Sequence, residues 1–410
     1  MKTLVLVLSV PAIIAFGYTA YLTFFAIPGS TPWLPVTTDK EVQSTEIDTE
    51  LEIGVTAPLR NDALSLRRVG DFTHHYSKRH VWNVDESLIL TSSAEVLNID
   101  GSLKIANPSI TAEAVWSNVH ANIVYAVQTI DERTRNLVSW NVDEDKIDLI
   151  HQFDDMDDLT IGQWEGTVSN DDKAIVLFGI DNGVATLVSY SLEEKAILGT
   201  MEAAANFNWA GVSQLGKWIL VENNKYPDPN AEIKRYNLDF SEETVLIEKP
   251  NHGDFCFDAK GNEVYAMAGR YIYWVELDTG LQFRHSLPPE NYGHLSCRAT
   301  ERPGWAYISA NTIGGSIGAV PLIENFQLWE PWGTHRSTSE NYMAQPKASV
   351  SRSGRAVLFS SNWLGDAEVG SYEISLDTDY VPGLSWKDAK IQASESDETE
   401  TAESEADPAR

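Results

Sequence analysis

Histidine, tyrosine and basic side chains gather in short connections that precede hydrophobic, strand-like runs of this sequence. Imidazole and phenol groups act as general acids and bases, and arginine or lysine neutralises a carboxylate or sulfate. Brought together in one site, these groups would suit an acidic ligand, and tryptophan would add a flat stacking surface. The candidates for binding such a ligand are His75, Tyr76, Arg79, Trp209, Arg298, Arg336 and Lys347.

The candidate residues precede strand–turn–strand units that are repeated along the chain. A short strand, a tight polar turn and a more hydrophobic strand recur along the chain, as in VWNVDESLILTS from Val81 and FCFDAKGNEVYAM from Phe255. Alternating and β-branched residues favour strands, and helical periodicity is nearly absent. The turns fall at Glu86, His120, Asp172, Gly216, Gly261, Gly304 and Gly354, at intervals of 34, 52, 44, 45, 43 and 50 residues.

Seven repeats of this length, with about four short strands each, predict an all-β, seven-bladed β-propeller. The seventh unit lacks one strand before the chain leaves the fold, so we expect residues 65–72 to supply it and close the ring. In a propeller, the connections that enter the innermost strands emerge on one face around the axis. The candidate residues should therefore share one axial mouth, although they lie far apart in sequence.

The repeats VSRSGRAVLFSSNW, VSQLGKWILV and FDAKGNEVYA resemble the strand–turn–strand units of TolB-like propellers. Oligogalacturonate lyases and some ulvan lyases are also seven-bladed propellers. The resemblance covers residues 72–376 and implies the fold. In this chain the Pro-Asp pair typical of the turn is replaced, by Gln214-Leu215 and by Arg352-Ser353 for example.

The candidate residues predict a propeller that engages an acidic glycan at its axial mouth. The resemblance implies a polysaccharide lyase, and the residues leave open whether the protein is catalytic. Such a lyase needs a neutralised carboxylate, a base for the C5 proton and an acid for the leaving oxygen. The candidates for proton transfer are His294, Tyr342 and His252. In addition, His252, His335 and Gln345 resemble the His/Gln metal site of oligogalacturonate lyases, which implies a divalent metal; the sequence identifies no other cofactor. The alternative is a non-catalytic scaffold that binds another protein of the cell envelope.

The composition limits the range of partners. The 410-residue chain has 43% hydrophobic residues, enough for a large core, and a formal net charge of −30. Binders of nucleic acid and of anionic membranes need basic surface, so the charge argues against both. We therefore expect an acidic polysaccharide or an envelope protein as partner, and contact with a membrane only through the N-terminal segment.

The two ends differ from the repeats in composition. Residues 1–27 contain an uncharged apolar run long enough to span a bilayer, and are predicted to be a signal anchor or a cleaved signal peptide. An extended linker follows at 28–64, then the propeller at 65–385 and a disordered acidic tail at 386–410. These boundaries predict a protein anchored in the membrane and facing the periplasm or extracellular space, or a secreted protein.

The two cysteines, Cys256 and Cys297, precede equivalent turns of the fifth and sixth repeats. Neighbouring inner strands would bring them within bridging distance in an oxidising compartment. The sequence is equally consistent with two buried free thiols.

Overall fold

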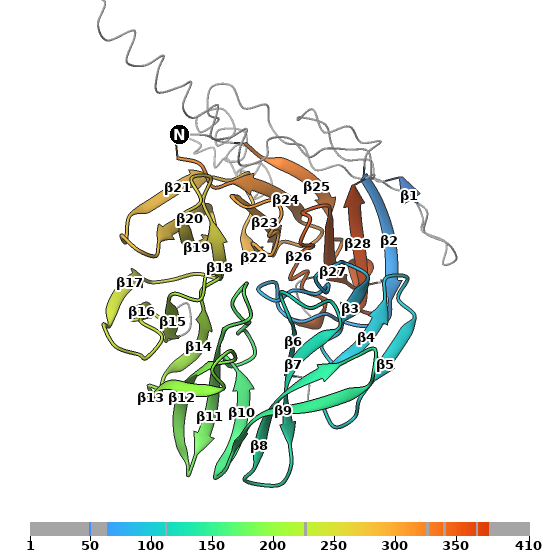
Figure 1. Ribbon diagram of the computed structural model, residues 1–410. Helices are drawn as coiled ribbons and strands as arrows, with labels where there is room; N and C mark the ends of the chain where they lie inside the picture. Colours follow the sequence, from blue (N-terminus) through green and yellow to red (C-terminus); the bar gives the residue numbers. More distant parts are fainter. Residues whose placement is uncertain are drawn as a thin grey trace, which may run out of the picture.

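The computed structural model describes residues 49–50, 64–110, 113–224, 228–324, 328–338, 342–365 and 368–376. These residues form seven antiparallel sheets arranged in a ring, which confirms the predicted seven-bladed propeller (Figure 1). The predicted N-terminal segment 1–27, most of the linker 28–64 and the acidic tail 386–410 lie outside the described residues. Within the described part of the chain, no helix has the length and apolar character needed to cross a membrane.

Each blade is built from consecutive strands, with the first strand innermost. Blade 1 consists of β3 (Leu88–Leu90), β4 (Glu95–Asn98) and β5 (Leu103–Ala106), and its innermost position is reduced to a bridge between Trp82 and Ile89. Blades 2 and 3 consist of β6 (Ala114–Trp116), β7 (Ile123–Thr129), β8 (Arg135–Asn141), β9 (Lys146–Phe153), β10 (Met156–Ile161), β11 (Ala174–Asp181), β12 (Val184–Ser191) and β13 (Ala196–Glu202). Blades 4 and 5 consist of β14 (Phe207–Val212), β15 (Ile219–Asn223), β16 (Glu232–Tyr236), β17 (Thr244–Glu248), β18 (Gly253–Phe257), β19 (Glu263–Ala268), β20 (Tyr271–Glu276) and β21 (Gln282–Ser286). Blade 6 consists of β22 (Tyr292–Ser296), β23 (Trp305–Ala310), β24 (Ser316–Pro321) and β25 (Glu330–Thr334).

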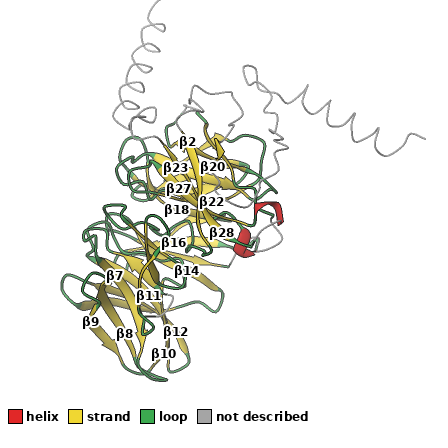
Figure 2. Cartoon of the chain, turned by 90° about the vertical axis from the view of Figure 1, so that its right-hand side faces the viewer, coloured by secondary structure: helices red, strands yellow, loops and turns green. Residues whose placement is uncertain are grey.

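Blade 7 joins the two ends of the ring. Its strands β26 (Ser349–Val350), β27 (Ala356–Ser361) and β28 (Gly370–Leu376) come from the end of the chain, and β2 (Leu64–Gly70) pairs antiparallel with β28. The predicted closing strand is thus confirmed, and the short β1 (Thr49–Glu50) pairs with its outer edge. Two 3₁₀ turns, η2 (Tyr342–Ala344) and η3 (Trp363–Gly365), lie on the same side of the molecule in Figure 2.

The hydrophobic core is divided among the seven interfaces between blades. In β11, Ile175 and Leu177 pack toward blade 2, whereas Ala174, Val176 and Phe178 pack toward blade 4. Successive side chains of a strand point to opposite faces, so one apolar strand serves two interfaces. The last interface, between blades 7 and 1, closes the ring in the same way. The axis is therefore left to polar side chains.

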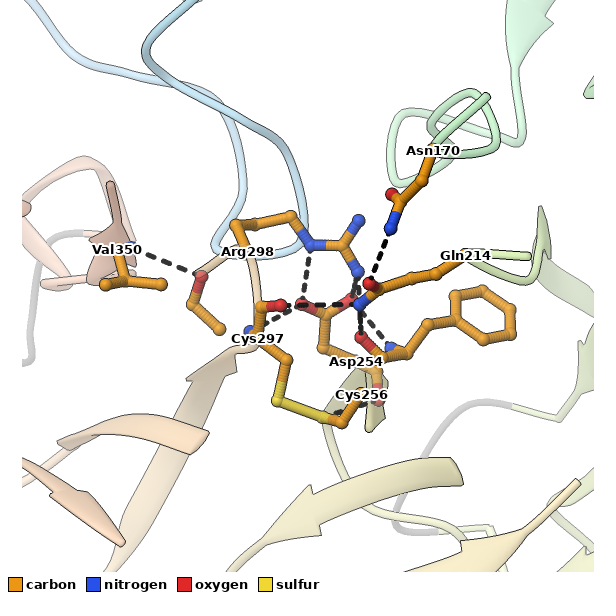
Figure 3. Close-up of a disulfide and its surroundings, with 9 residues drawn as sticks. Asn170, Gln214, Asp254, Cys256, Cys297, Arg298 and Val350 are labelled. Carbon is orange, nitrogen blue, oxygen red and sulfur yellow. Dashed lines mark hydrogen bonds and ion pairs between the residues drawn. A yellow bond between two sulfur atoms is a disulfide. The ribbon is translucent and has the colours of Figure 1, made fainter. Parts of the chain in front are cut away.

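The altered turn residues form contacts between blades. The Gln214 side chain donates to the backbone carbonyls of Phe255 and Cys297 and accepts from Asn170 at 3.0 Å (Figure 3). On the other side of the ring, the Arg352 guanidinium donates to the side chain of Asn118 at 2.8 Å. The replacements of the usual Pro-Asp pair thus stabilise the ring.

The two cysteines are bridged, which decides between the alternatives that the sequence left open. Cys256 lies in β18 and Cys297 directly follows β22; their Cα atoms are 5.1 Å apart (Figure 3). The disulfide joins the innermost strands of blades 5 and 6.

Candidate functional site

The connection between β2 and blade 1 lies inside the ring (blue in Figure 1). We call its residues 73–80 the axial segment. The ring nitrogen Nε2 of His74 bonds to the Lys347 carbonyl of blade 7 at 2.8 Å, and Lys78 forms an ion pair with Glu165 of blade 3 at 2.6 Å. Tyr76 reaches His252 at the entry of blade 5. The axial segment therefore occupies the centre of the mouth. The sequence predicted instead that it would be one of seven equivalent connections around the mouth.

Four predicted site residues form one cluster that includes Tyr76 and His294. The Tyr76 hydroxyl and His252 Nδ1 share a hydrogen bond of 2.9 Å. The His252 and His294 rings stack with centroids 5.7 Å apart, and Tyr76 meets His294 edge-on at 5.3 Å. On its other side, His294 Nε2 bonds to Gln345 Oε1 at 3.3 Å. Blades 5, 6 and 7 and the axial segment thus contribute to one aromatic cluster: Tyr76, His252, His294 and Gln345.

The protonation of His294 follows from these contacts. The carbonyl oxygen Oε1 of Gln345 can only accept, so Nε2 of His294 donates and Nδ1 keeps its lone pair. The pKa of His294 lies well below its usual 6.5, mainly because the ring is buried and secondly because His252 is near. The ring is therefore neutral at pH 7. Its Nδ1 is buried and has no hydrogen-bond partner among the described residues. Burial also raises the pKa of the Tyr76 hydroxyl well above 10.

Two arginines of the mouth, Arg79 and Arg298, are paired with buried acids, so the mouth is less cationic than the sequence predicts. Arg79 lies 3.0 Å from Glu113, and Arg298 binds Asp254 through two nitrogens; these side chains are at most 2% exposed. Each guanidinium also donates to backbone carbonyls. The acids come from other blades than the arginines that they bind. Arg79 and Arg298 therefore hold the fold together, and neither faces an open site.

Lys347 differs from these two arginines. Its ammonium lies 3.5 Å from the centre of the Tyr342 ring, and among the described residues it has no carboxylate within ion-pair distance. Burial lowers its pKa to about 8, partly offset by the charge of Glu165. Tyr342 covers it from η2 and is 59% exposed. A cation and an exposed phenol thus meet at the rim of the mouth.

The predicted metal residues do not come together as ligands. Both ring nitrogens of His335 are bonded to backbone, Nε2 to the Ala310 carbonyl at 2.8 Å and Nδ1 to the Ser337 amide at 3.0 Å. Gln345 Oε1 is occupied by His294. Within the part of the chain that is described, no three His, Cys, Asp or Glu side chains are grouped so that they could hold a metal ion. The donor set therefore does not fit the predicted divalent-metal site.

Three other predicted ligand residues have different surroundings. Trp209 is 1% exposed and packs between Lys78, at 3.9 Å from its ring, and the stacked ring of Tyr265, so it offers no open stacking surface. His75 lies against Arg79 at 3.4 Å, and burial holds its pKa well below 6.5. Arg336 is half-buried and lies over the Trp363 ring at 5.4 Å.

A bulge beside the axial segment was missed from the sequence. Between β10 and the Val168–Ile175 bridge, residues 162–166 (GQWEG) leave the innermost strand of blade 3. Gly162, Gln163 and Trp164 all have left-handed backbone, with φ of 56°, 58° and 74°. Two glycines flanking a tryptophan were the available signal, because glycine permits such backbone and close approach.

Comparison with known proteins agrees with this architecture. No protein-family model matches the chain, and no curated protein matches its sequence. Among solved structures, an oligogalacturonate lyase from Vibrio parahaemolyticus superposes with a TM-score of 0.58 at 14% identity, over 78% of this chain and 95% of that one. An oligogalacturonate lyase in complex with manganese gives 0.58 at 11% identity, over 77% and 93%. This chain shares their fold. TolB from Acinetobacter baumannii is more distant, with a TM-score of 0.35 at 13% identity, over 61% of this chain and 62% of that one.

At these identities the likeness establishes the seven-bladed fold alone. The predicted resemblance to oligogalacturonate lyases at the level of the fold is thereby confirmed. What the mouth binds has to be argued from its own residues.

Proposed function

We propose that this protein is an exported propeller that binds an acidic oligosaccharide at its axial mouth, where Lys347 takes a carboxylate of the ligand. The observation that carries the proposal is the state of Lys347, which is 7% exposed and has no carboxylate partner among the described residues. With a pKa of about 8, it is mostly charged at neutral pH despite its burial. A ligand carboxylate would supply the missing partner through a charge-assisted hydrogen bond.

The surroundings of Lys347 favour a sugar acid over a simple anion. Tyr342 places an exposed aromatic ring against the ammonium, and a ring of this kind can stack on the apolar face of a pyranose. The net charge of −30 repels polyanions elsewhere on the surface, so binding has to depend on a local cation.

Catalysis of β-elimination is not part of this proposal. His294 Nδ1 is the neutral, unprotonated nitrogen best suited to remove a C5 proton, but it is buried beneath Tyr76 and His252. A base has to come within hydrogen-bond distance of the proton that it removes. We therefore expect no increase in absorbance near 235 nm, roughly the band of unsaturated uronates, when the protein is mixed with pectate.

Export, with a tether through the apolar N-terminal run, belongs to the same proposal. Disulfides persist in oxidising compartments and are rare in the cytosol, and the Cys256–Cys297 bridge is an internal one in the propeller. Alkylation of thiols after denaturation without a reductant, in cells first quenched with acid, should leave both cysteines unlabelled. Quantitative labelling of both would contradict export.

A scaffold that binds an envelope protein is the second candidate. It is favoured by the buried pairs Arg79–Glu113 and Arg298–Asp254, which use side chains of the mouth for stability. If calorimetry detects no binding of trigalacturonate to the wild-type protein, this result would support the second function.

Replacing Lys347 with methionine should weaken the binding of trigalacturonate about 10- to 100-fold. This range corresponds to the roughly 1.5–3 kcal/mol of a hydrogen bond to a charged group. Isothermal titration calorimetry measures it. The matched control is Lys217→Met, which removes an exposed lysine that is paired with Asp278 and follows the Gly216 turn. Equal affinity of Lys347→Met and wild type would contradict the assigned role.

The pH dependence distinguishes this lysine from the other cations. A carboxylate binds the charged form, whose population falls as pH rises through a pKa of about 8. The affinity should be nearly constant below pH 7 and fall about tenfold per unit above pH 8. Lys347→Arg keeps its charge over this range, so its affinity should not fall. A fall of the same size in Lys347→Arg would assign the titration to another group.

A further inference from the structure

We propose that Trp164 is a second binding residue of the mouth, a platform on which a pyranose ring of the acidic oligosaccharide stacks. This inference rests on the proposed function and identifies a contact that Lys347 does not provide.

Trp164 is the only largely exposed tryptophan among the described residues. Its side chain is 52% exposed, whereas Trp82, Trp116, Trp140 and Trp209 are at most 2% exposed. Large aromatic side chains contribute most to stability when buried, so an exposed one in a bulge beside the axial segment calls for another explanation. Recognition of a ligand with an apolar face is such an explanation.

The backbone holds this side chain outward against its own preference. Gln163 and Trp164 have φ of 58° and 74°, a region that a bulky residue rarely adopts. Residues in such conformations persist where their surroundings determine them, and they cluster at ligand sites. The two strained residues stand in the middle of the bulge at 162–166.

A buried ion pair fixes both ends of the bulge. The Gly166 amide donates to the Ile161 carbonyl at 3.1 Å, which closes the loop. Arg79 donates to the carbonyls of Gly166 at 2.9 Å and Ile161 at 3.1 Å, and Glu113 accepts from the Ile161 amide at 2.9 Å. The arginine of the axial segment thus holds the bulge of blade 3 in a rigid shape. A preorganised loop loses little entropy when a ligand binds.

The bulge lies next to the proposed carboxylate site. Glu165, the neighbour of Trp164, forms an ion pair with Lys78 at 2.6 Å. The axial segment connects this carboxylate to Lys347, because His74, four residues before Lys78, bonds to the Lys347 carbonyl at 2.8 Å. A chain of several sugar units that places one carboxylate at Lys347 could therefore rest another unit on Trp164.

The test is a titration of the full chain with trigalacturonate. Trp164→Ala should weaken binding about 10- to 30-fold, whereas Trp164→Phe, which keeps an aromatic face, should change it less than about 3-fold. Binding to wild type should change the tryptophan fluorescence, and Trp164→Phe should bind with most of this change lost. The matched control is Tyr273→Ala, which removes an exposed aromatic residue of β20, the third strand outward in blade 5.

The outcomes separate this inference from the proposed function. If wild type binds and Trp164→Ala binds equally well, the stacking role is overturned and the role of Lys347 stands. If wild type itself does not bind trigalacturonate, the proposed function is overturned. A loss of affinity in Trp164→Ala that Tyr273→Ala reproduces would also overturn the stacking role.

Discussion

Replacing Arg298 with alanine should lower the free energy of unfolding by about 3–5 kcal/mol, because it leaves the Asp254 carboxylate buried without its cation. Both side chains are 1% exposed. The Arg298 guanidinium donates to Asp254 at 3.0 Å and to the Phe255 carbonyl at 3.0 Å, and Asp254 also accepts from the Cys297 amide at 2.9 Å (Figure 3). Denaturation with guanidinium chloride, followed by tryptophan fluorescence, measures the change.

The control for this variant is an ion pair in solvent. Lys217→Ala breaks the Lys217–Asp278 pair, whose side chains are 52% and 59% exposed, and should cost less than about 1 kcal/mol. Replacing both buried partners, as in Asp254→Leu with Arg298→Met, should recover much of the lost stability, because no charge then remains unpaired. An effect of Arg298→Ala as small as that of Lys217→Ala would show that the carboxylate is not confined as described.

Removing the disulfide should have an effect of similar size. The bridge closes a loop with a sequence separation of 41, and the chain-entropy relation gives about 4 kcal/mol for a loop of that length. The variant is Cys256→Ala with Cys297→Ala, because both positions are buried and serine would place a hydroxyl among apolar side chains. The free energy of unfolding from chemical denaturation, compared with oxidised wild type, measures it.

Two further measurements sharpen this experiment. Wild type unfolded under reducing conditions should show the same stability as the double variant to within about 1 kcal/mol. Because the bridge joins β18 and β22 next to His252 and His294, the NMR signals of these two histidines should broaden or shift in the variant. A double variant as stable as oxidised wild type would mean that other contacts hold blades 5 and 6 together without the bridge.

The part of the site that could be predicted is the set of residues that share the mouth. His252, His294 and Gln345 lie upstream of equivalent turns, and the circular geometry brings them together as the sequence predicts. The part that could not be predicted is the partner of each cation. Glu113 and Asp254 lie far from Arg79 and Arg298 in sequence, and no local pattern marks them as partners.

The sequence also could not predict which aromatic side chains are exposed, because the residues that cover them lie far away in the sequence. Trp209 and Trp164 both stand upstream of a turn, and either would serve as a stacking residue by type alone. Lys78 from the axial segment covers Trp209, whereas the bulge turns Trp164 outward. Whether an aromatic residue near the axis is covered depends on which other segments pass over it. The axial segment that covers Trp209 precedes blade 1, whereas Trp209 belongs to blade 4, so no pattern near Trp209 in the sequence indicates the contact.

The sequence by itself determined the architecture of this protein: seven blades, alternating strands that feed two interfaces each, and a closing strand from residues before the first repeat. These features follow from side-chain periodicity and turn residues, which act within a few positions of one another. Only the folded ring shows that the axial segment crosses the centre of the mouth, that Arg79 and Arg298 are neutralised there, and that Lys347 keeps a charge without a carboxylate partner among the described residues. The physical reason is that burial and ion pairing depend on which distant residues meet in space, and a closed ring brings together seven segments whose contacts no local pattern encodes.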